Sequence, residues 1–357
     1  MELTAGEHQQ YSRHLLLEKV GMQGQVKLKQ AKVVVIGAGG LSCPVLQYLA
    51  AAGVGRIGIV DYDIVEQSNL QRQILYTHQD IGKSKVTVAV KKLQGLNPFI
   101  QFNAHQTRLT KENALTLLAP YDIIVDGTDN FPTRYLLNDA AVLLDKPIVF
   151  GSIHTFEGQV SVFNFKNGPT YRCLYPTPPP PNEVPNCSEI GVLGVLPGII
   201  GSLQANEVLK IILGLETILS GQLLTFDALS MKQSIFSFKK IAAPPIHALE
   251  EDYQALCGIY TDIEEISVQE YKQQASNFNL LDVRTQAERD AFYIKSIHIP
   301  LDELPERYTE IADNKDLLVF CKSGVRSKTA INILQNNRFK KELVSLKGGL
   351  LSGMPFT

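Results

Sequence analysis

The apolar residues in the first part of the chain fall into short β-branched runs that alternate with stretches of helical pattern. Residues 32–36 (Lys-Val-Val-Val-Ile) and 56–60 (Arg-Ile-Gly-Ile-Val) are two such runs, and residues 44–52 between them carry a helical pattern. A run that is apolar at nearly every position indicates a strand buried on both faces, as in a parallel sheet. The pattern therefore predicts a strand–helix–strand unit with glycine-rich connections at 37–42 and 53–55.

The same alternation continues to about residue 240 and predicts an α/β fold with a mostly parallel sheet. Further strands are expected at 100–104, 122–126, 146–150, 159–165, 223–226 and 234–238, and helices at 82–96, 111–118, 132–144 and 191–213.

Two changes in composition divide the chain. Residues 176–185 hold six prolines, which favour a stiff, extended segment over a helix or strand. Residues 241–262 have the composition of a linker, and a second, smaller α/β pattern begins after them. We therefore expect a larger α/β domain at 1–240, a linker at 241–262 and a small α/β domain at 263–357.

Composition narrows the class of protein. The chain has 357 residues, of which 45% are apolar and 20% charged, with a net charge of −2, so no strong field points to a nucleic acid or an anionic membrane. Its longest apolar run, residues 191–201, is too short to span a bilayer, and no signal-like stretch follows Met1. Five dispersed cysteines favour free thiols in a reducing compartment. We expect a cytoplasmic protein that binds neither nucleic acid nor membrane.

The first strand–helix–strand unit predicts a nucleotide site. Glycines let the backbone of the 37–42 turn approach phosphate oxygens, which then lie on the N–H groups at the start of the helix. Asp61 ends the second strand, where a carboxylate accepts hydrogen bonds from a ribose. Ser42 stands where the dinucleotide fingerprint has its third glycine, so the turn alone leaves the identity of the nucleotide open.

Polar residues near this turn add possible phosphate ligands. The segment 66–73 is rich in Ser, Asn and Gln and includes Arg72, whose planar guanidinium suits phosphate. Lys83 and Lys85 open a helix, an unfavourable position beside its dipole, so they are either solvated or bound to an anion. Asp129 follows the strand at 122–126 and fits either a magnesium ion or the cap of the next helix.

Two cysteines are candidate nucleophiles. Cys321 follows the predicted strand at 317–320 and opens a loop of Cys321, Lys322, Ser323, Gly324, Val325 and Arg326 before a helix. Loops of this shape surround a sulfur with backbone N–H groups, and Lys322 and Arg326 would favour its thiolate. The same loop shape serves phosphatases and persulfide carriers. Cys187 precedes the 191–213 helix, where a thiol is either nucleophilic or buried and inert.

With these residues in view, the chain resembles the MoeB/ThiF family of ubiquitin-activating-type adenylyltransferases with a C-terminal rhodanese domain. The rhodanese part rests on the Cys321 loop, Asp-Val-Arg at 282–284 and His-Ile-Pro at 298–300. The adenylyltransferase part, a Rossmann-like domain, rests on Tyr-Ser-Arg-His at 11–14, Gly-Ala-Gly-Gly-Leu at 37–41, Asp-Tyr-Asp at 61–63, Ser-Asn-Leu-Gln-Arg-Gln at 68–73, Gly-Lys-Ser-Lys at 82–85, Thr-Asp-Asn at 128–130 and Gly-Ser-Leu-Gln-Ala-Asn-Glu at 201–207.

This resemblance implies roles for individual residues. ATP would be the nucleotide, Asp129 would hold Mg²⁺ against its phosphates, and Arg13 would reach the triphosphate of the other subunit of a homodimer. The remaining ATP-binding positions would be Gly40, Asp61, Ser68, Asn69, Leu70, Gln71, Arg72, Lys85 and Asn130.

The resemblance also implies a reaction and its partners. The C-terminal Gly-Gly carboxylate of a ubiquitin-like sulfur-carrier protein of the MoaD/ThiS type would be adenylated. Cys321 would then pass sulfur to it as a persulfide received from a cysteine desulfurase or another sulfur donor. Cys187 matches a crossover-loop cysteine thought to form an acyl or acyl-disulfide link with the carrier. The pathway, whether molybdopterin, thiamin or thiolated-tRNA synthesis, stays open.

The chain departs from the family at its zinc site. Relatives usually bind zinc through two Cys-x-x-Cys pairs, but here the pairs read Thr170-x-x-Cys173 and Gln254-x-x-Cys257. Two thiolates do not complete a tetrahedral set, so we predict no zinc.

Three other functions compete with this interpretation. The chain could adenylate a peptide or small carboxylate in natural-product maturation, although a rhodanese domain would then be superfluous. It could be a non-catalytic adaptor that binds the carrier, but Arg72 and Lys85 are retained. Those two residues and the Thr-Asp-Asn turn also suit a triphosphate better than the nicotinamide of a dehydrogenase.

Overall fold

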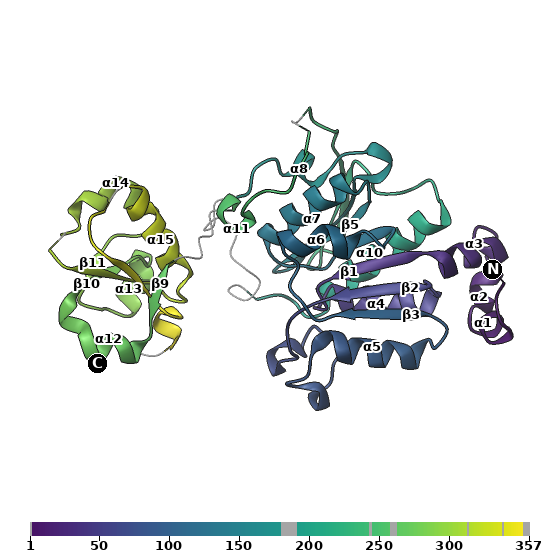
Figure 1. Cartoon of the computed structure of the whole chain (residues 1–357), viewed down its shortest axis with the longest axis horizontal. Helices are drawn as coiled ribbons and strands as arrows, with labels where there is room; N and C mark the ends of the chain where they lie inside the picture. The colour runs from purple at the N-terminus through teal and green to yellow at the C-terminus, as the bar shows by residue number, and fades with distance from the viewer. Residues whose placement is uncertain are drawn as a thin grey trace. The chain divides into compact units, whose positions relative to one another are not determined.

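The computed structural model describes residues 2–179, 191–242, 245–257, 263–312, 314–337 and 339–352 (Figure 1). The chain forms two compact units. The larger unit ends at Tyr253, and the main part of the smaller unit begins at Gln254. Both are α/β units, so the predicted fold class is confirmed.

The larger unit is built on an eight-stranded sheet in the order β3-β2-β1-β4-β5-β6-β7-β8. The first five of these strands are parallel, and β6, β7 and β8 continue the sheet in antiparallel fashion. The strands are β1 (Lys32–Ile36), β2 (Arg56–Val60), β3 (Gln101–His105), β4 (Ile123–Asp126), β5 (Ile148–His154), β6 (Glu157–Phe163), β7 (Gln222–Asp227) and β8 (Lys232–Ser237).

Helices connect and cover these strands (Figure 1). They are α1 (Ala5–Gln10), α2 (Ser12–Leu15), α3 (Gly21–Gln30), α4 (Ser42–Ala52), α5 (Lys85–Leu96), α6 (Lys111–Leu118), α7 (Phe131–Leu143), α8 (Tyr171–Leu174) and α10 (Leu196–Leu213). The short helix α11 (Tyr253–Leu256) begins on the last residue of this unit. The 3-10 turns of this unit are η1 (Gln67–Asn69), η2 (His78–Asp80) and η3 (Phe165–Asn167).

Helix α10 begins later than its sequence pattern suggested. The pattern indicated a helix from residue 191, but α10 starts at Leu196, with Pro197 in its first turn, where a missing N–H costs nothing. The preceding residues bind elsewhere: the Leu193 N–H donates to the Thr155 carbonyl at 3.1 Å, and Val192 forms a bridge to Thr155. Because residues 192 and 193 pair with the turn after β5, they do not join the helix.

By length and composition alone, α10 is apolar enough to cross a membrane. In the structure it is a core helix of the larger unit, packed on α4, β5 and β6. Gly201 permits the close approach, because a Cβ there would lie 2.2 Å from the Leu41 carbonyl oxygen. Buried Gln204 donates to the Asp126 carbonyl at 2.7 Å and to the Val149 carbonyl at 3.2 Å. These contacts tie α10 to the sheet.

The smaller unit has a five-stranded, fully parallel sheet in the order β11-β10-β12-β13-β9. Buried residues such as Leu281, Val319 and Ile331 form its core. Its elements are β9 (Glu264–Ile266), α12 (Val268–Gln274), η4 (Ala275–Asn277), β10 (Phe278–Asp282), α13 (Gln286–Ala291), β11 (Ile297–His298), α14 (Leu304–Arg307), η5 (Tyr308–Glu310), β12 (Asp316–Phe320), α15 (Val325–Asn336), β13 (Leu343–Leu346) and η6 (Gly349–Ser352).

Candidate functional site

The glycine turn after β1 is held open by the carboxylate at the end of β2. The Ala38 N–H donates to Asp61 Oδ2 at 2.7 Å, and the Asp63 N–H donates to Asp61 Oδ1 at 2.7 Å. Gly37 has a φ of +88°, and a Cβ there would lie 2.8 Å from the Gly127 carbonyl oxygen. Asp61 is half-buried, and each of its oxygens retains a lone pair for a ligand hydroxyl.

The two lysines at the start of α5 have different environments. Lys83 is exposed, whereas the Lys85 side chain is buried and its Nζ lies 3.0 Å from Asp63 Oδ2. The Asp63 side chain is 46% exposed, so an incoming anion can share or replace it as the partner of Lys85. The solvated interpretation therefore fits Lys83, and Lys85 is a cation held at the site.

The segment 66–73 lies beside the glycine turn. Arg72 donates from Nη1 to the Ser68 carbonyl at 3.1 Å, and its Cγ lies 3.5 Å from where a Gly40 Cβ would stand. Buried Asn69 accepts at Oδ1 from the Glu66 N–H at 3.2 Å. Asn69 therefore shapes the segment, and Arg72 borders the turn at Gly40.

The neighbouring positions of this segment face different ways. Ser68 and Gln71 are exposed and Leu70 is half-buried. A Cβ on Gly194 would lie 2.3 Å from the Gln71 carbonyl oxygen, so the chain just before α10 passes against this segment.

Two buried polar atoms near the turn lack a partner within the described chain, namely Ser42 Oγ and Gln73 Oε1. A Cβ on Gly39 would lie 3.7 Å from Gln73 Nε2, which puts this amide against the turn. Unsatisfied buried polar atoms are costly unless a ligand or water completes them. They fit a polar ligand such as a triphosphate. The sequence motifs contained both residues but did not single them out as ligands.

The turn after β4 assigns separate tasks to Asp129 and Asn130. Asn130 caps α7, because its Oδ1 accepts from the Thr133 N–H at 3.0 Å. Asp129 is not the cap, and its carboxylate is exposed. Asp126 is buried, and its Oδ1 accepts from the Thr128 N–H at 2.9 Å. Burial raises the pKa of Asp126 against the opposing charge of Arg134.

Arg13 lies at the other edge of the sheet. It is exposed on α2, next to Tyr11, whose hydroxyl accepts from Asn97 Nδ2 at 2.8 Å just after the last turn of α5. Helices α4 and α5 start at the carboxyl edge of the parallel strands and run back to their amino edge, about 16 Å away for 11 residues. Arg13 is therefore remote from the glycine turn of its own chain, and α1–α3 gather at one end of the unit in Figure 1.

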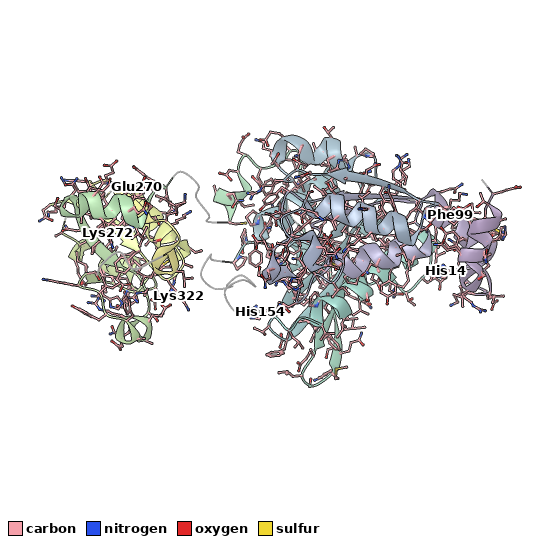
Figure 2. All side chains as sticks on the ribbon, turned by 90° about the horizontal axis from the view of Figure 1, so that it is seen from below. His14, Phe99, His154, Glu270, Lys272 and Lys322 are labelled. Atoms are coloured by element: carbon pink, nitrogen blue, oxygen red, sulfur yellow. The ribbon has the colours of Figure 1, made fainter. Side chains whose placement is uncertain are left out.

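In the smaller unit, the loop after β12 encloses the Cys321 sulfur. Cys321 is fully buried, and the Gly324 N–H donates to its Sγ at 3.1 Å. Ser327 Oγ lies 3.9 Å from the sulfur and donates to the Gly324 carbonyl at 3.0 Å. The Leu350 N–H donates to the Cys321 carbonyl at 3.0 Å and so ties the start of the loop to the segment after β13. Figure 2 shows Lys322, which is exposed, at the surface of this unit.

Arg326 has a partner that the sequence did not reveal. Its Nη1 and Nη2 donate to Glu288 Oε2 and Oε1, both at 2.7 Å. This ion pair holds the pKa of Glu288 down, at about 2. The sequence had assigned the Arg326 charge to the sulfur, but here a carboxylate from α13 balances it.

The Asp-Val-Arg and His-Ile-Pro motifs form a scaffold for α13. Asp282 and Arg284 make a buried ion pair with a shortest distance of 2.6 Å. Arg284 also donates to the carbonyls of Glu288 and Phe292, at 3.1 and 2.9 Å, and His298 Nε2 lies 2.8 Å from the Arg284 carbonyl oxygen. These motifs therefore position the helix that carries Glu288.

Of the remaining predicted residues, Cys187 lies outside the described residues. Cys173 accepts at Sγ from the Thr170 N–H at 3.3 Å, and Cys257 is buried. Burial raises the pKa of Cys173, but hydrogen bonds from Thr170 outweigh it and the net direction is downward. Across the described ranges, no three His, Cys, Asp or Glu side chains form a metal-binding group. The donor set does not fit zinc, and the absence of zinc from this protein stays a prediction.

An ion pair joins the segments that would flank such a zinc site. Buried Asp139 on α7 accepts from Arg172 Nε and Nη2 at 2.8 and 2.7 Å, and from the Tyr253 hydroxyl at 2.9 Å. The carboxylate thus ties α8 and Tyr253 to the body of the larger unit. No pattern in the sequence indicated this contact.

The chain matches two family models. The one described as the ThiF family covers residues 11–246, and the one described as a rhodanese-like domain covers residues 267–352. The first range holds the glycine turn, the 66–73 segment and Lys85. The second holds the Cys321 loop.

Known proteins align with most of this chain. The sulfur carrier protein adenylyltransferase of Thermus thermophilus is 53% identical over 270 residues, covering 72% of this chain and all of its own length. The adenylyltransferase and sulfurtransferase MOCS3 of Xenopus laevis is 43% identical over 391 residues, covering 98% of this chain and 87% of its own.

A solved structure shares the fold of the larger part of the chain. The crystal structure of Escherichia coli MccB with MccA-N7isoASN has a TM-score of 0.59 and 23% identity, covering 67% of this chain and 74% of its own. At this identity the likeness shows the fold alone.

Proposed function

Because the chain belongs to the ThiF family and carries a rhodanese-like domain, we propose that it activates and sulfurates a ubiquitin-like sulfur-carrier protein. ATP would adenylate the C-terminal Gly-Gly carboxylate of a MoaD/ThiS-type carrier. Sulfur held on Cys321 would then replace AMP. The observation that carries this proposal is one chain with a glycine turn beside buried Lys85 and a loop that encloses the Cys321 sulfur. A relative named for both activities supports it, and so does one named as a sulfur carrier protein adenylyltransferase.

The proposed ATP site combines the elements around the glycine turn. Asp61 would accept from the ribose, while Gly40, Arg72 and Lys85 would border the phosphates. Asn69 and Asn130 shape the two loops at this edge of the sheet. The carrier carboxylate attacks the α-phosphorus, an acyl–oxygen–phosphorus bond forms, and pyrophosphate leaves. Positioning and charge neutralisation by these residues supply most of the catalysis in such transfers.

Magnesium fits the site in a limited way. Asp129 offers an exposed carboxylate near the turn, and Mg²⁺ commonly uses one or two carboxylates plus phosphate oxygens. When bound, the ion would neutralise charge on the phosphates. Asp129 is the residue of this chain that would hold the ion, because Asp126 is buried and hydrogen-bonded to Thr128.

Arg13 acts in trans in this proposal. Its position at the amino edge of the sheet keeps it from the ATP site of its own chain. A second copy in a homodimer would present its Arg13 to that site, where the guanidinium would stabilise the triphosphate.

The sulfur step begins on Cys321. The terminal sulfur of its persulfide attacks the acyl carbon, a carbon–sulfur bond forms, and AMP leaves as the acyl–oxygen bond breaks. A thiol then attacks the Cys321 Sγ, the S–S bond of this acyl disulfide breaks, and the thiocarboxylate leaves. The disulfide formed between that thiol and Cys321 is reduced by a cellular dithiol before the next cycle. Cys187, the counterpart of the crossover-loop cysteine that links to the carrier, is our candidate for the attacking thiol. A cysteine desulfurase or a similar donor would recharge Cys321. The carrier would serve molybdopterin, thiamin or thiolated-tRNA synthesis.

A second candidate function is adenylation of a peptide or small carboxylate. It would use the same ATP site but leave the Cys321 loop without a task. The loop's N–H contact to sulfur therefore favours the carrier proposal.

The deciding experiment is ATP–pyrophosphate exchange with candidate carriers, alongside thiosulfate sulfurtransferase activity. We expect exchange only with a Gly-Gly carrier. Cys321→Ala should abolish sulfur transfer and leave exchange intact, with Cys257→Ala as the control for loss of another buried thiol. If no Gly-Gly carrier supports pyrophosphate exchange, carrier activation is refuted. Sulfur transfer that survives Cys321→Ala would refute the role of that residue.

A further inference from the structure

The Cys321 loop has the shape of loops that hold anions, and the side chains around it bear on which anions it accommodates. The sulfur is buried, and the Gly324 N–H points at it. Backbone N–H groups stabilise any anion, whether a persulfide or an oxyanion. A selective loop therefore needs a further group that distinguishes a single charge on sulfur from two charges spread over oxygens.

Arg326 is the group whose chemistry would favour an oxyanion. A guanidinium presents parallel N–H donors that match the oxygens of thiosulfate, phosphate or sulfate. Arg326 stands in the first turn of α15, next to Ser327, whose Oγ lies 3.9 Å from the sulfur. Its side chain therefore starts from the rim of the loop.

Glu288 occupies that fork. Both carboxylate oxygens accept from Arg326, each at 2.7 Å, in a bidentate pair whose side chains are 25% and 29% exposed. Glu288 is itself held in place, because its Oε2 accepts from the Thr285 N–H at 3.0 Å and the Thr285 hydroxyl at 3.2 Å. Both terminal nitrogens of Arg326 therefore already have a carboxylate partner before any substrate arrives.

We propose that Glu288 is a specificity-determining residue that withholds Arg326 from the Cys321 loop and so favours persulfide donors over dianionic oxyanions. Lys322 remains as an exposed cation, and the backbone N–H groups remain as the main anion donors. A persulfide presents one small anionic sulfur, which this arrangement accommodates. Thiosulfate and phosphate lose the fork that would bind their oxygens. The inference rests on the proposed sulfur transfer by Cys321.

The favoured reaction is a balanced exchange. The Cys321 thiolate attacks the outer sulfur of a donor R–S–SH, and a bond forms between Sγ and that sulfur. The S–S bond of the donor breaks, and the donor thiol leaves with the proton. No external oxidant or reductant is required.

Glu288→Gln in the full-length protein tests the proposal. The amide keeps the size of the side chain and an oxygen for Thr285, but it removes the charge and places an NH₂ group against the guanidinium. The assay measures kcat/KM with thiosulfate and with an alkyl persulfide, and the inhibition constant of inorganic phosphate. We expect the ratio of kcat/KM for thiosulfate to that for persulfide to rise about 5- to 10-fold, through a lower KM for thiosulfate. Phosphate should inhibit more tightly by a similar factor.

The double variant Glu288→Gln/Arg326→Gln distinguishes an effect on donor selectivity through Arg326 from a merely structural role of Glu288. If Arg326 causes the gain, the double variant loses it. Lys328→Gln on the same helix is the matched control, since Lys328 pairs with Glu265 at 2.9 Å and should leave the ratio unchanged. Equal losses of kcat with both donors in Glu288→Gln, or a gain that persists in the double variant, would overturn the proposal.

Two further outcomes keep the test decisive. If Glu288→Gln does not fold, the unaltered protein still provides a test. An inhibition constant for phosphate below about 1 mM would refute the proposal that Glu288 withholds Arg326. Sulfur transfer that survives Cys321→Ala refutes the function itself, whereas an unchanged donor ratio in Glu288→Gln refutes only the selectivity.

Discussion

Asp61 offers the sharpest test of the proposed ATP site, through the substitution Asp61→Asn. Its two carboxylate oxygens each accept a backbone N–H at 2.7 Å, one from Ala38 and one from Asp63. Asparagine keeps one acceptor oxygen, and its NH₂ group then faces the other N–H. One charge-assisted hydrogen bond is lost, and two donors are left against each other.

The size of the effect follows from that count. Loss of one hydrogen bond to a charged acceptor costs about 1.5–3 kcal/mol of unfolding free energy. For a unit of this size the melting temperature should fall by about 3–12 °C. The ribose would lose its charged acceptor as well, so the dissociation constant of ATP should rise about 10- to 100-fold.

Calorimetric ATP binding and thermal melts of the same preparations measure both effects. Asp122→Asn is the matched control, because Asp122 Oδ2 accepts from the Lys32 N–H at 2.8 Å at the opposite end of β1. It should melt within a few degrees of the unaltered protein and bind ATP unchanged. If Asp61→Asn loses stability but binds ATP within about twofold of the unaltered protein, Asp61 supports the turn and does not bind the ribose.

The remaining predictions concern Arg13 and Glu288. Mixing Arg13→Ala with Lys85→Met, each inactive in pyrophosphate exchange by itself, should restore about a quarter of the activity, because half of the reassorted dimers hold one intact site; no recovery would contradict action in trans. Glu288 has a pKa lowered from 4.5 to about 2, so its pair with Arg326 stabilises the fold above pH 4.5 and is lost as the pH falls towards 2. Melts of Glu288→Gln should therefore show a deficit of about 1–2 kcal/mol at pH 7 that disappears near pH 2, and a deficit independent of pH would contradict this assignment.

The sequence by itself determined the fold class and the kind of site. Runs such as 32–36 are apolar on both faces, and only a covered parallel sheet buries them. The glycines of the 37–42 turn and the loop that starts at Cys321 are local signals, because a few consecutive residues create the backbone shape that the chemistry needs. The resemblance to the ThiF and rhodanese families followed from these segments, and both family models match.

Only the tertiary structure decided which charges meet. Lys83 and Lys85 look alike in sequence, yet Lys85 alone is buried against Asp63, 22 positions away. Asn130 takes the cap and leaves Asp129 free of that role. Arg326 meets Glu288 across 38 positions, a pairing that no local pattern encodes. The hydrophobic period and the turn residues are properties of neighbours along the chain, whereas ion pairs depend on how separate elements pack. The ion pair between α13 and α15 is what gives the loop at Cys321 its proposed selectivity.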